Sequence, residues 1–221
     1  MIKAVIFDMD GVIIDSEGVY LKHMLAFVRM INPAVTEEQL RQVVGRSAAD
    51  CWKRVRELAG VDTPWETLRD QYRSGRWGSP LQVDYRAIFR PEMRLAVAEL
   101  RRKGYRLAVA SSTGLATVRQ ALDENGIGGE FDAVVSGEIF RESKPNPQIY
   151  HHTAGLLGVR GEACLVLEDS TVGIQAALAA GMRVAALTDE RFGFEQWRAH
   201  YQISRIRDLL DLDVLKEACA L

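Results

Sequence analysis

Residues 4–11 read AVIFDMDG, a short apolar run that ends abruptly in two aspartates and a glycine. The run Ala4–Phe7 lacks polar alternation, which is typical of a strand buried on both faces of a parallel sheet. Gly11 allows the chain to turn sharply just after the acids. The segment therefore predicts a central strand with Asp8 and Asp10 at its carboxyl end.

Apolar runs of the same kind recur along the chain, and they span residues 107–110, 133–135, 164–167 and 184–187. Segments with helical patterns lie between them, over residues 91–103, 113–125, 147–157 and 170–180. Proline opens two of these segments, Ser170 is a capping residue, and a glycine follows each. Alternating strands and helices indicate right-handed crossovers. We therefore expect an α/β fold with a doubly wound, Rossmann-like parallel sheet.

One long stretch after the first strand breaks this alternation, because about 70 residues pass with helical signals alone. Within it, Thr36 with Gln39 and Thr63 with Glu66 have the spacing of capping boxes. We expect an inserted all-helical cap domain. The expected boundaries are residues 15–85 for the cap, and residues 1–14 and 86–221 for the Rossmann-like core.

Composition narrows the possible partners and the compartment. The 221 residues carry a formal net charge of -2, so the protein has no overall positive charge that would favour binding to nucleic acid or to an acidic membrane. Cys51, Cys164 and Cys219 are far apart and odd in number, which favours a reducing interior over a disulfide framework. The N-terminus lacks a signal-peptide pattern, and no segment approaches the roughly 20 apolar residues of a membrane span. We expect a cytoplasmic protein that is a monomer or a weak homodimer.

Polar groups follow four of the predicted strands. In an open parallel sheet, ligands bind beyond the carboxyl ends of the strands. The groups found there are Asp8 and Asp10, then Ser111–Ser112–Thr113, then Ser143–Lys144, and last Glu168–Asp169–Ser170. We therefore expect carboxylates, hydroxyls and one ammonium group to meet at one edge of the sheet.

The acids at this edge would repel one another without a cation among them. A hard divalent ion with oxygen ligands satisfies them, and magnesium is the common choice. Asp8 and Asp169 are the natural ligands, with Glu168 close by. Taken alone, Asp169 could instead cap the following helix, and Asp10 could be a cap beside Gly11.

The remaining groups suit a bound phosphate. Lys144 would hold phosphate oxygens by charge and Ser111 by a hydrogen bond, with Ser112 as the alternative to Ser111. A carboxylate such as that of Asp8 can attack phosphorus and form an aspartyl phosphate. A second carboxylate two residues on, Asp10, could protonate the leaving oxygen and later deprotonate the attacking water.

With these motifs in order, the chain resembles the haloacid dehalogenase-like superfamily, and within it the sugar-phosphate phosphatases and β-phosphoglucomutases. The resemblance runs from end to end. It rests on D-M-D-G-V at residues 8–12, on Ser111, on Lys144 in S-K-P-N-P, and on E-D-S at residues 168–170. It implies a magnesium-dependent phosphatase that acts on a small-molecule phosphate ester, which in this subgroup is a sugar phosphate. The alternative is a phosphomutase of the β-phosphoglucomutase type.

The resemblance also implies roles for single residues. Asp8 would be the nucleophile and a metal ligand, and Asp10 the general acid and base, with its main-chain carbonyl on the metal. Asp169 would be a metal ligand, and Glu168 would support the metal site directly or through water. The family pattern assigns the transferring phosphoryl group to Ser111 and Lys144.

Two residues of the insert are candidate substrate contacts. Gly45 precedes a predicted helix start and permits a loop that carries Arg46. Other protein classes fit the motifs less well. A receiver domain would have its phosphoacceptor after a later strand, a dinucleotide-binding protein would have a glycine-rich first turn, and a metal-free dehalogenase leaves Asp10 and Asp169 without a use.

Overall fold

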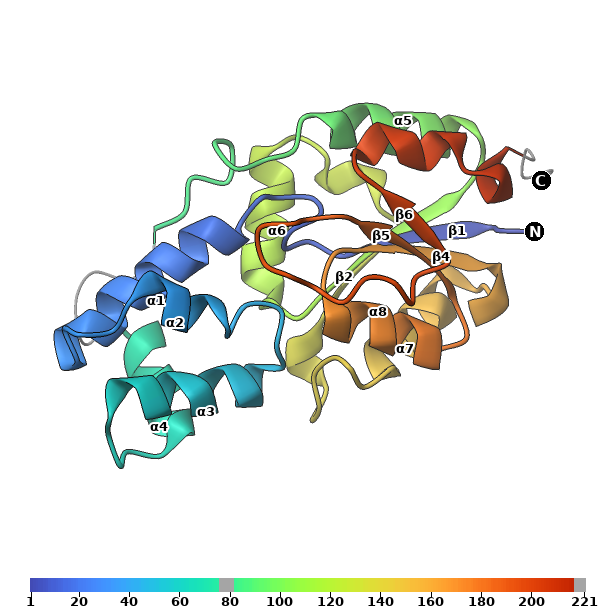
Figure 1. The fold of residues 1–221 in the computed structure, drawn as a ribbon. Coiled ribbons are helices and arrows are strands. Elements are labelled where there is room, and N and C mark those ends of the chain that lie inside the picture. The colour runs from blue at the N-terminus through green and yellow to red at the C-terminus, as the bar shows by residue number, and fades with distance from the viewer. Residues whose placement is uncertain (76–81, 217–221) are drawn as a thin grey trace. The chain divides into compact units, whose positions relative to one another are not determined.

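The computed structural model describes residues 1–75 and 82–216, so Cys219 lies outside the described part of the chain. Within these ranges a parallel sheet has the strand order β3-β2-β1-β4-β5-β6 (Figure 1). Its strands are β1 (Ala4–Phe7), β2 (Arg106–Ser111), β3 (Ala133–Ser136), β4 (Cys164–Glu168), β5 (Arg183–Leu187) and β6 (Tyr201–Ile203). The doubly wound sheet expected from the sequence is confirmed, with β6 as an addition at the edge.

Helices cover both faces of this sheet. They are α5 (Glu92–Arg102), α6 (Leu115–Glu124), α7 (Gln148–Leu157) and α8 (Thr171–Ala179). Short 3-10 turns join the elements, and they are η1 (Gly128–Glu130), η2 (Gly137–Ile139), η3 (Gly161–Ala163), η4 (Ile206–Asp211) and η5 (Asp213–Leu215). Figure 1 shows α5 and η4 on one side of the sheet and α7 and α8 on the other.

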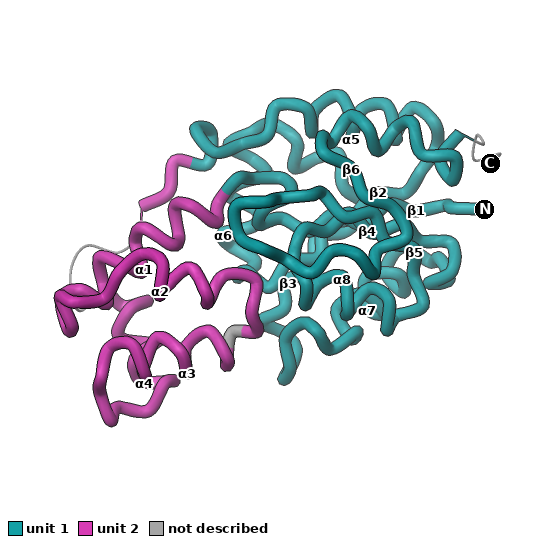
Figure 2. The backbone as a smooth tube through the Cα atoms, in the orientation of Figure 1, with its two compact units in different colours: residues 1–15, 85–221 teal, residues 16–84 magenta. Residues whose placement is uncertain are grey.

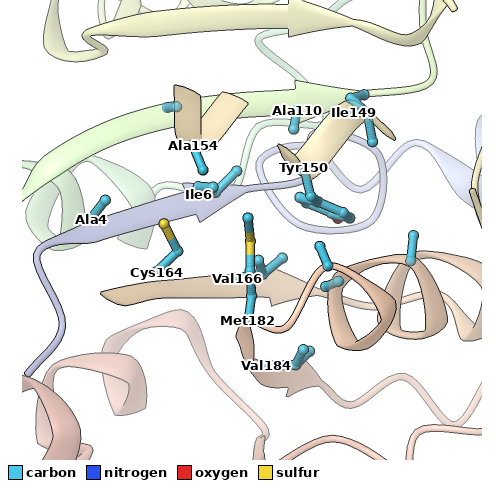
Figure 3. Packing of buried hydrophobic residues seen from close by; sticks show 14 of the residues in the cluster. Ala4, Ile6, Ala110, Ile149, Tyr150, Ala154, Cys164, Val166, Met182 and Val184 are labelled. Atoms are coloured by element: carbon cyan, nitrogen blue, oxygen red, sulfur yellow. The ribbon is translucent and has the colours of Figure 1, made fainter. Parts of the chain in front are cut away.

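The central strand is buried on both faces because its residues are apolar throughout. Ala4 and Ile6 belong to the cluster that packs beneath α7 and α8 (Figure 3), and Val5 and Phe7 are equally buried. Burying a side chain such as that of Ile6 contributes about 1.5–3 kcal/mol. A strand of this kind cannot lie at an edge of the sheet, so the residues that follow it are fixed at the centre.

The order of the strands defines where a ligand binds. From β1 the chain winds outward through β2 and β3, and then returns to form β4 on the other side of β1. In a doubly wound sheet this reversal leaves a crevice at the carboxyl ends of the two strands. Phe7 pairs with Leu167, so Asp8 and Glu168 come next on neighbouring strands.

The chain divides into two compact units (Figure 2). The first consists of Met1–Asp15 and Tyr85–Leu221, and the second is the continuous segment Ser16–Asp84. In its described part the second unit is all-helical, with α1 (Glu17–Ile31), α2 (Glu37–Arg41), α3 (Ala48–Ala59) and α4 (Trp65–Arg73). An aromatic cluster of Phe27, Trp52 and Tyr72 holds α1, α3 and α4 together, with the rings of Trp52 and Tyr72 5.2 Å apart.

One of the two predicted capping boxes is present. Thr36 accepts from the main chain of Gln39, whose side chain accepts in return. The box predicted at Thr63 is wrong, because Pro64 occupies the N-cap position and α4 has no side-chain cap. The helix starts one residue later than the box requires, which leaves Thr63 outside it.

Two further findings bear on the predictions from composition. Cys51 and Cys164 are free thiols. Among the helices of residues 1–75 and 82–216, none combines the length and apolarity needed to cross a membrane.

Candidate active site

Three buried carboxylates converge at the carboxyl ends of β1 and β4. Asp8, Glu168 and Asp169 each place a carboxylate oxygen within 4.8 Å of the others. The three residues are at most 7% exposed. Acids so close together and so far from water require cations or hydrogen-bond donors around them.

Lys144 supplies one such cation. Its Nζ donates to Asp8 Oδ1 at 2.6 Å, to Glu168 Oε1 at 2.7 Å and to the main-chain oxygen of Ala110 at 3.0 Å. An ammonium group has three protons, and each has an acceptor here. The lysine is therefore held in one position between two carboxylates.

The pKa values of Asp8 and Lys144 depend on each other. Burial raises the pKa of the Asp8 carboxyl to about 8, although the charge of Lys144 opposes the rise. Burial alone would lower the pKa of Lys144. The negative charges of Asp8 and Glu168 raise it by more than burial lowers it, so the pKa lies well above its usual value. Lys144 therefore stays protonated, and a second cation beside Asp8 would favour its ionised form.

Glu168 is saturated with donors from the protein. Its Oε1 accepts from Lys144 and from the hydroxyl of Tyr150 at 3.0 Å. Its Oε2 accepts from the main-chain N–H groups of Asp169 and Ser170 and from the Ser170 hydroxyl, each at 3.0 Å. A carboxylate offers about four lone-pair sites, so Glu168 is used chiefly to fix its neighbours.

Tyr150 was not among the residues predicted from the sequence. Besides the bond to Glu168, its ring centroid lies 5.0 Å from the Nζ of Lys144. Burial and the charge of Glu168 raise the pKa of Tyr150 well above its usual value, so the phenol remains a donor. Figure 3 shows its ring among the side chains packed between α7 and the sheet.

Two glycines make room for the acids. A Cβ on Gly173 would lie 1.7 Å from Glu168 Oε1, and one on Gly11 would lie 1.9 Å from Asp169 Oδ2. Gly11 also has a φ of 77°, which other residues rarely adopt. Helix α8 is capped by Ser170, whose Oγ accepts from the N–H of Gly173, so the helix cap is not Asp169.

The donor set fits a hard divalent cation. Asp8 and Asp169 are buried carboxylates from adjacent strand ends, which is the ligand type that magnesium prefers. Glu168 lies within the same cluster, but its oxygens already accept hydrogen bonds from the protein. Asp8 and Asp169 are therefore the better candidates for direct contact with an ion, and Glu168 for support.

Asp10 lies beside this cluster in a less buried position. The hydroxyl of Thr113 donates to its Oδ2 at 2.7 Å, a contact that was not expected from the sequence. Ser111 is fully buried, and its Oγ accepts from the N–H of Thr113 while keeping its own proton for donation. Ser112 is exposed, with its Oγ 3.2 Å from that of Ser143.

Gly45 and Arg46 belong to the second unit. Gly45 has a φ of 71°, as a tight turn before α3 requires. Arg46 is exposed, and its Nε donates to the main-chain oxygen of Gln42 at 2.6 Å. Their contact with a substrate stays a prediction.

Comparison with known proteins gives a consistent result. A protein-family model described as haloacid dehalogenase-like hydrolase matches residues 5–187. Protein SUPPRESSOR OF QUENCHING 1, chloroplastic, of Arabidopsis thaliana is 32% identical over 196 residues, covering 84% of this chain but only 18% of that protein. Hexitol phosphatase B of Escherichia coli strain K12 is 30% identical over 224 residues, covering 97% of both.

Solved structures support the fold. A crystal structure of β-phosphoglucomutase from Clostridium difficile matches with a TM-score of 0.75 at 19% identity, over 95% of this chain and 93% of that one. At this identity the likeness concerns the architecture and not the reaction.

Proposed function

This chain belongs to the haloacid dehalogenase-like hydrolase family, and we propose that it is a magnesium-dependent phosphatase acting through an aspartyl phosphate. Its substrate would be a small phosphorylated metabolite, specifically a sugar phosphate. The observation that carries the proposal is the convergence of Asp8, Lys144 and Asp169 at the point where the strand order reverses.

In the first step, a carboxylate oxygen of Asp8 attacks the phosphorus of the ester. The phosphorus–oxygen bond to the leaving group breaks, and Asp10 donates a proton to the departing oxygen. Lys144, whose Nζ lies 2.6 Å from Asp8 Oδ1, offsets negative charge on the transferring phosphoryl group. The hydroxyl of Ser111 adds a hydrogen bond to the same group.

In the second step, water attacks the phosphorus of the aspartyl phosphate. Asp10, now ionised, accepts a proton from this water, and the bond between phosphorus and Asp8 breaks. Inorganic phosphate leaves, and both aspartates return to their starting states. The same carboxylate thus acts as acid and then as base.

Magnesium, held by Asp8 and Asp169, would supply positive charge that keeps Asp8 ionised and lowers the cost of bringing an anionic ester to it. The fit of the two buried carboxylates to a hard cation supports this assignment. Glu168 would keep Lys144 in place beside them.

The substrate class rests on similarity to one relative. Hexitol phosphatase B is 30% identical over 97% of this chain, and its name identifies a phosphorylated sugar alcohol as its substrate class. We propose that the second unit serves as a cap that selects the substrate, with Arg46 as a candidate contact. An arginine at such a site would bind phosphate or hydroxyl oxygens.

A direct test is a screen of the purified protein with magnesium against phosphorylated sugars, sugar alcohols and non-sugar monoesters. Both inorganic phosphate and isomeric sugar phosphates would be followed. We expect phosphate release, fastest from a member of the sugar group. An isomer formed from β-glucose 1-phosphate without phosphate release would instead identify a phosphomutase, and no reaction with any ester would reject the proposal.

A further inference from the structure

The hydroxyl of Thr113 joins the loop after β2 to the residue that we assign as acid and base. Thr113 Oγ1 donates to Asp10 Oδ2 at 2.7 Å, and the two residues are 103 positions apart in the chain. Both lie in the first unit, after neighbouring strands of the sheet. The contact is therefore built by the fold and not by local sequence.

The position of Thr113 is fixed through its main chain. Its N–H donates to Ser111 Oγ at 3.0 Å, and its carbonyl accepts from the hydroxyl of Ser136 at 2.8 Å. Threonine is branched at Cβ, which restricts rotation about χ1. The hydroxyl is thus held at a defined point beside Asp10.

A threonine just before a helix is a candidate helix cap, but the Thr113 hydroxyl makes a different contact. Helix α6 starts at Leu115, its N-cap is Gly114, and no side chain caps it. The Thr113 hydroxyl donates across the sheet edge to Asp10. A hydrogen bond to a carboxylate is stronger than one to a neutral acceptor.

We propose that Thr113 is a positioning residue that holds the carboxylate of Asp10 for proton transfer, an inference that rests on the proposed phosphatase function. The hydroxyl donates to Oδ2 and so fixes the orientation of the Asp10 carboxyl group. In the proposed reaction, the carboxyl proton of Asp10 moves to the leaving oxygen as the ester bond breaks. Water returns a proton to Asp10 as it attacks the aspartyl phosphate.

The test compares esters that need the acid to different degrees. Thr113→Val removes the hydroxyl at nearly constant size, and Thr113→Ser keeps it. A series of substituted phenyl phosphates, from p-nitrophenyl to unsubstituted phenyl, raises the pKa of the leaving group within one chemical class. We expect kcat/KM of Thr113→Val to fall about 10-fold for phenyl phosphate and less than about 2-fold for p-nitrophenyl phosphate, with Thr113→Ser close to wild type.

A matched control separates positioning from structure. Thr153 is buried, and its hydroxyl donates to the carbonyl of Ile149 at 2.7 Å within α7. Thr153→Val loses a similar hydrogen bond away from Asp10, so its dependence on the leaving group should match wild type. A uniform loss across the series in Thr113→Val would assign the threonine a structural role and overturn the inference.

Asp10→Asn distinguishes failure of this inference from failure of the function. A steeper dependence on the leaving group in Asp10→Asn, with none in Thr113→Val, would reject the role of Thr113 and leave the phosphatase intact. An unchanged dependence in Asp10→Asn would remove the acid role of Asp10, and with it the inference. Absence of phosphate release by the wild-type protein would reject the proposed function itself.

Discussion

Two parts of the candidate site hold their polar groups very differently. In the lysine cluster, defined as Asp8, Lys144, Tyr150 and Glu168, every residue is at most 7% exposed. The two charged groups at its centre, Lys144 and Glu168, make three and five hydrogen bonds. The loop at residues 111–113 reaches from a buried serine to the surface.

The difference follows from what each part does in the proposed reaction. Neither Lys144 nor Glu168 exchanges a proton in the proposed steps, so a rigid and dry environment strengthens their electrostatic effect without obstructing a step. Asp10 exchanges a proton with a leaving group and then with water, and it is only partly buried. Changes that disturb Lys144 or Glu168 should therefore alter both catalysis and stability, whereas changes at the loop should alter catalysis selectively.

The largest effect is expected at the centre of the lysine cluster. Asp8→Asn replaces the proposed nucleophile with a group of the same shape, and turnover should fall by roughly 10⁴-fold or more. The fold should persist, because burial already raises the pKa of this carboxyl to about 8 and a neutral side chain suits the site. Steady-state phosphate release and circular dichroism measure the two outcomes.

Asp213→Asn is the matched control for this change. Its side chain is 91% exposed in a pair with Lys216, and such pairs contribute little. Turnover should remain at the wild-type level. Normal activity in Asp8→Asn would reject the nucleophile and the comparison built on it.

The second-largest loss of activity is expected on removal of divalent metal. Chelation should reduce hydrolysis of p-nitrophenyl phosphate by about 10³-fold, since the metal contributes several kcal/mol to charge stabilisation. Magnesium should restore activity and also raise Tm, because it binds the folded state. The rise in Tm should disappear in Asp169→Asn. Full activity after chelation would exclude the magnesium proposal.

The central strands of the fold were predictable because a strand buried on both faces of a sheet is a short run of apolar residues. All residues of β1 are apolar, as are the central residues of β2, β4 and β5. The strand β6 was missed because Tyr201–Ile203 is only three residues long, with Gln202 at its centre. Such a strand is made by pairing with β5, and local sequence does not specify it.

The candidate site was predictable only where its residues lie at the carboxyl ends of strands or in the loops beyond them. Asp8, Lys144, Glu168 and Asp169 come together, although their roles remain proposals. Tyr150 lies inside the helix α7, and its position in the helical pattern is that of an ordinary buried core residue. Which helical residue meets a buried carboxylate depends on how α7 packs on the sheet, and sequence pattern alone does not give that geometry.

Gly173→Ala tests whether the lysine cluster tolerates any displacement. The added Cβ would lie 1.7 Å from Glu168 Oε1, so that carboxylate must move and disturb Lys144. We expect kcat to fall about 10²-fold and stability to fall by about 1–3 kcal/mol, as overpacking does. Phosphate release and urea unfolding measure these changes.

Gly155→Ala in α7 is the matched control, because a Cβ there meets nothing within 4 Å. It should leave activity unchanged and stabilise the protein by up to about 1 kcal/mol through helix propensity. Opposite signs of the two stability changes are thus expected for the same substitution. Similar changes in both variants would mean that Glu168 is not held as described.

The smallest effect is expected for Tyr150→Phe, which removes one hydroxyl from the lysine cluster and keeps the ring beside Lys144. Tyr105→Phe is its partner, since that hydroxyl is also buried and donates to the carbonyl of Leu215 at 3.2 Å. Each change should lower stability by about 1 kcal/mol. Only Tyr150→Phe should lower kcat, by about 3- to 10-fold with KM unchanged, because Glu168 then holds Lys144 less firmly. Equal kcat values for the two variants would show that the Tyr150 hydroxyl contributes to stability and not to catalysis. The proposed difference in catalytic role between the lysine cluster and the loop would then be wrong.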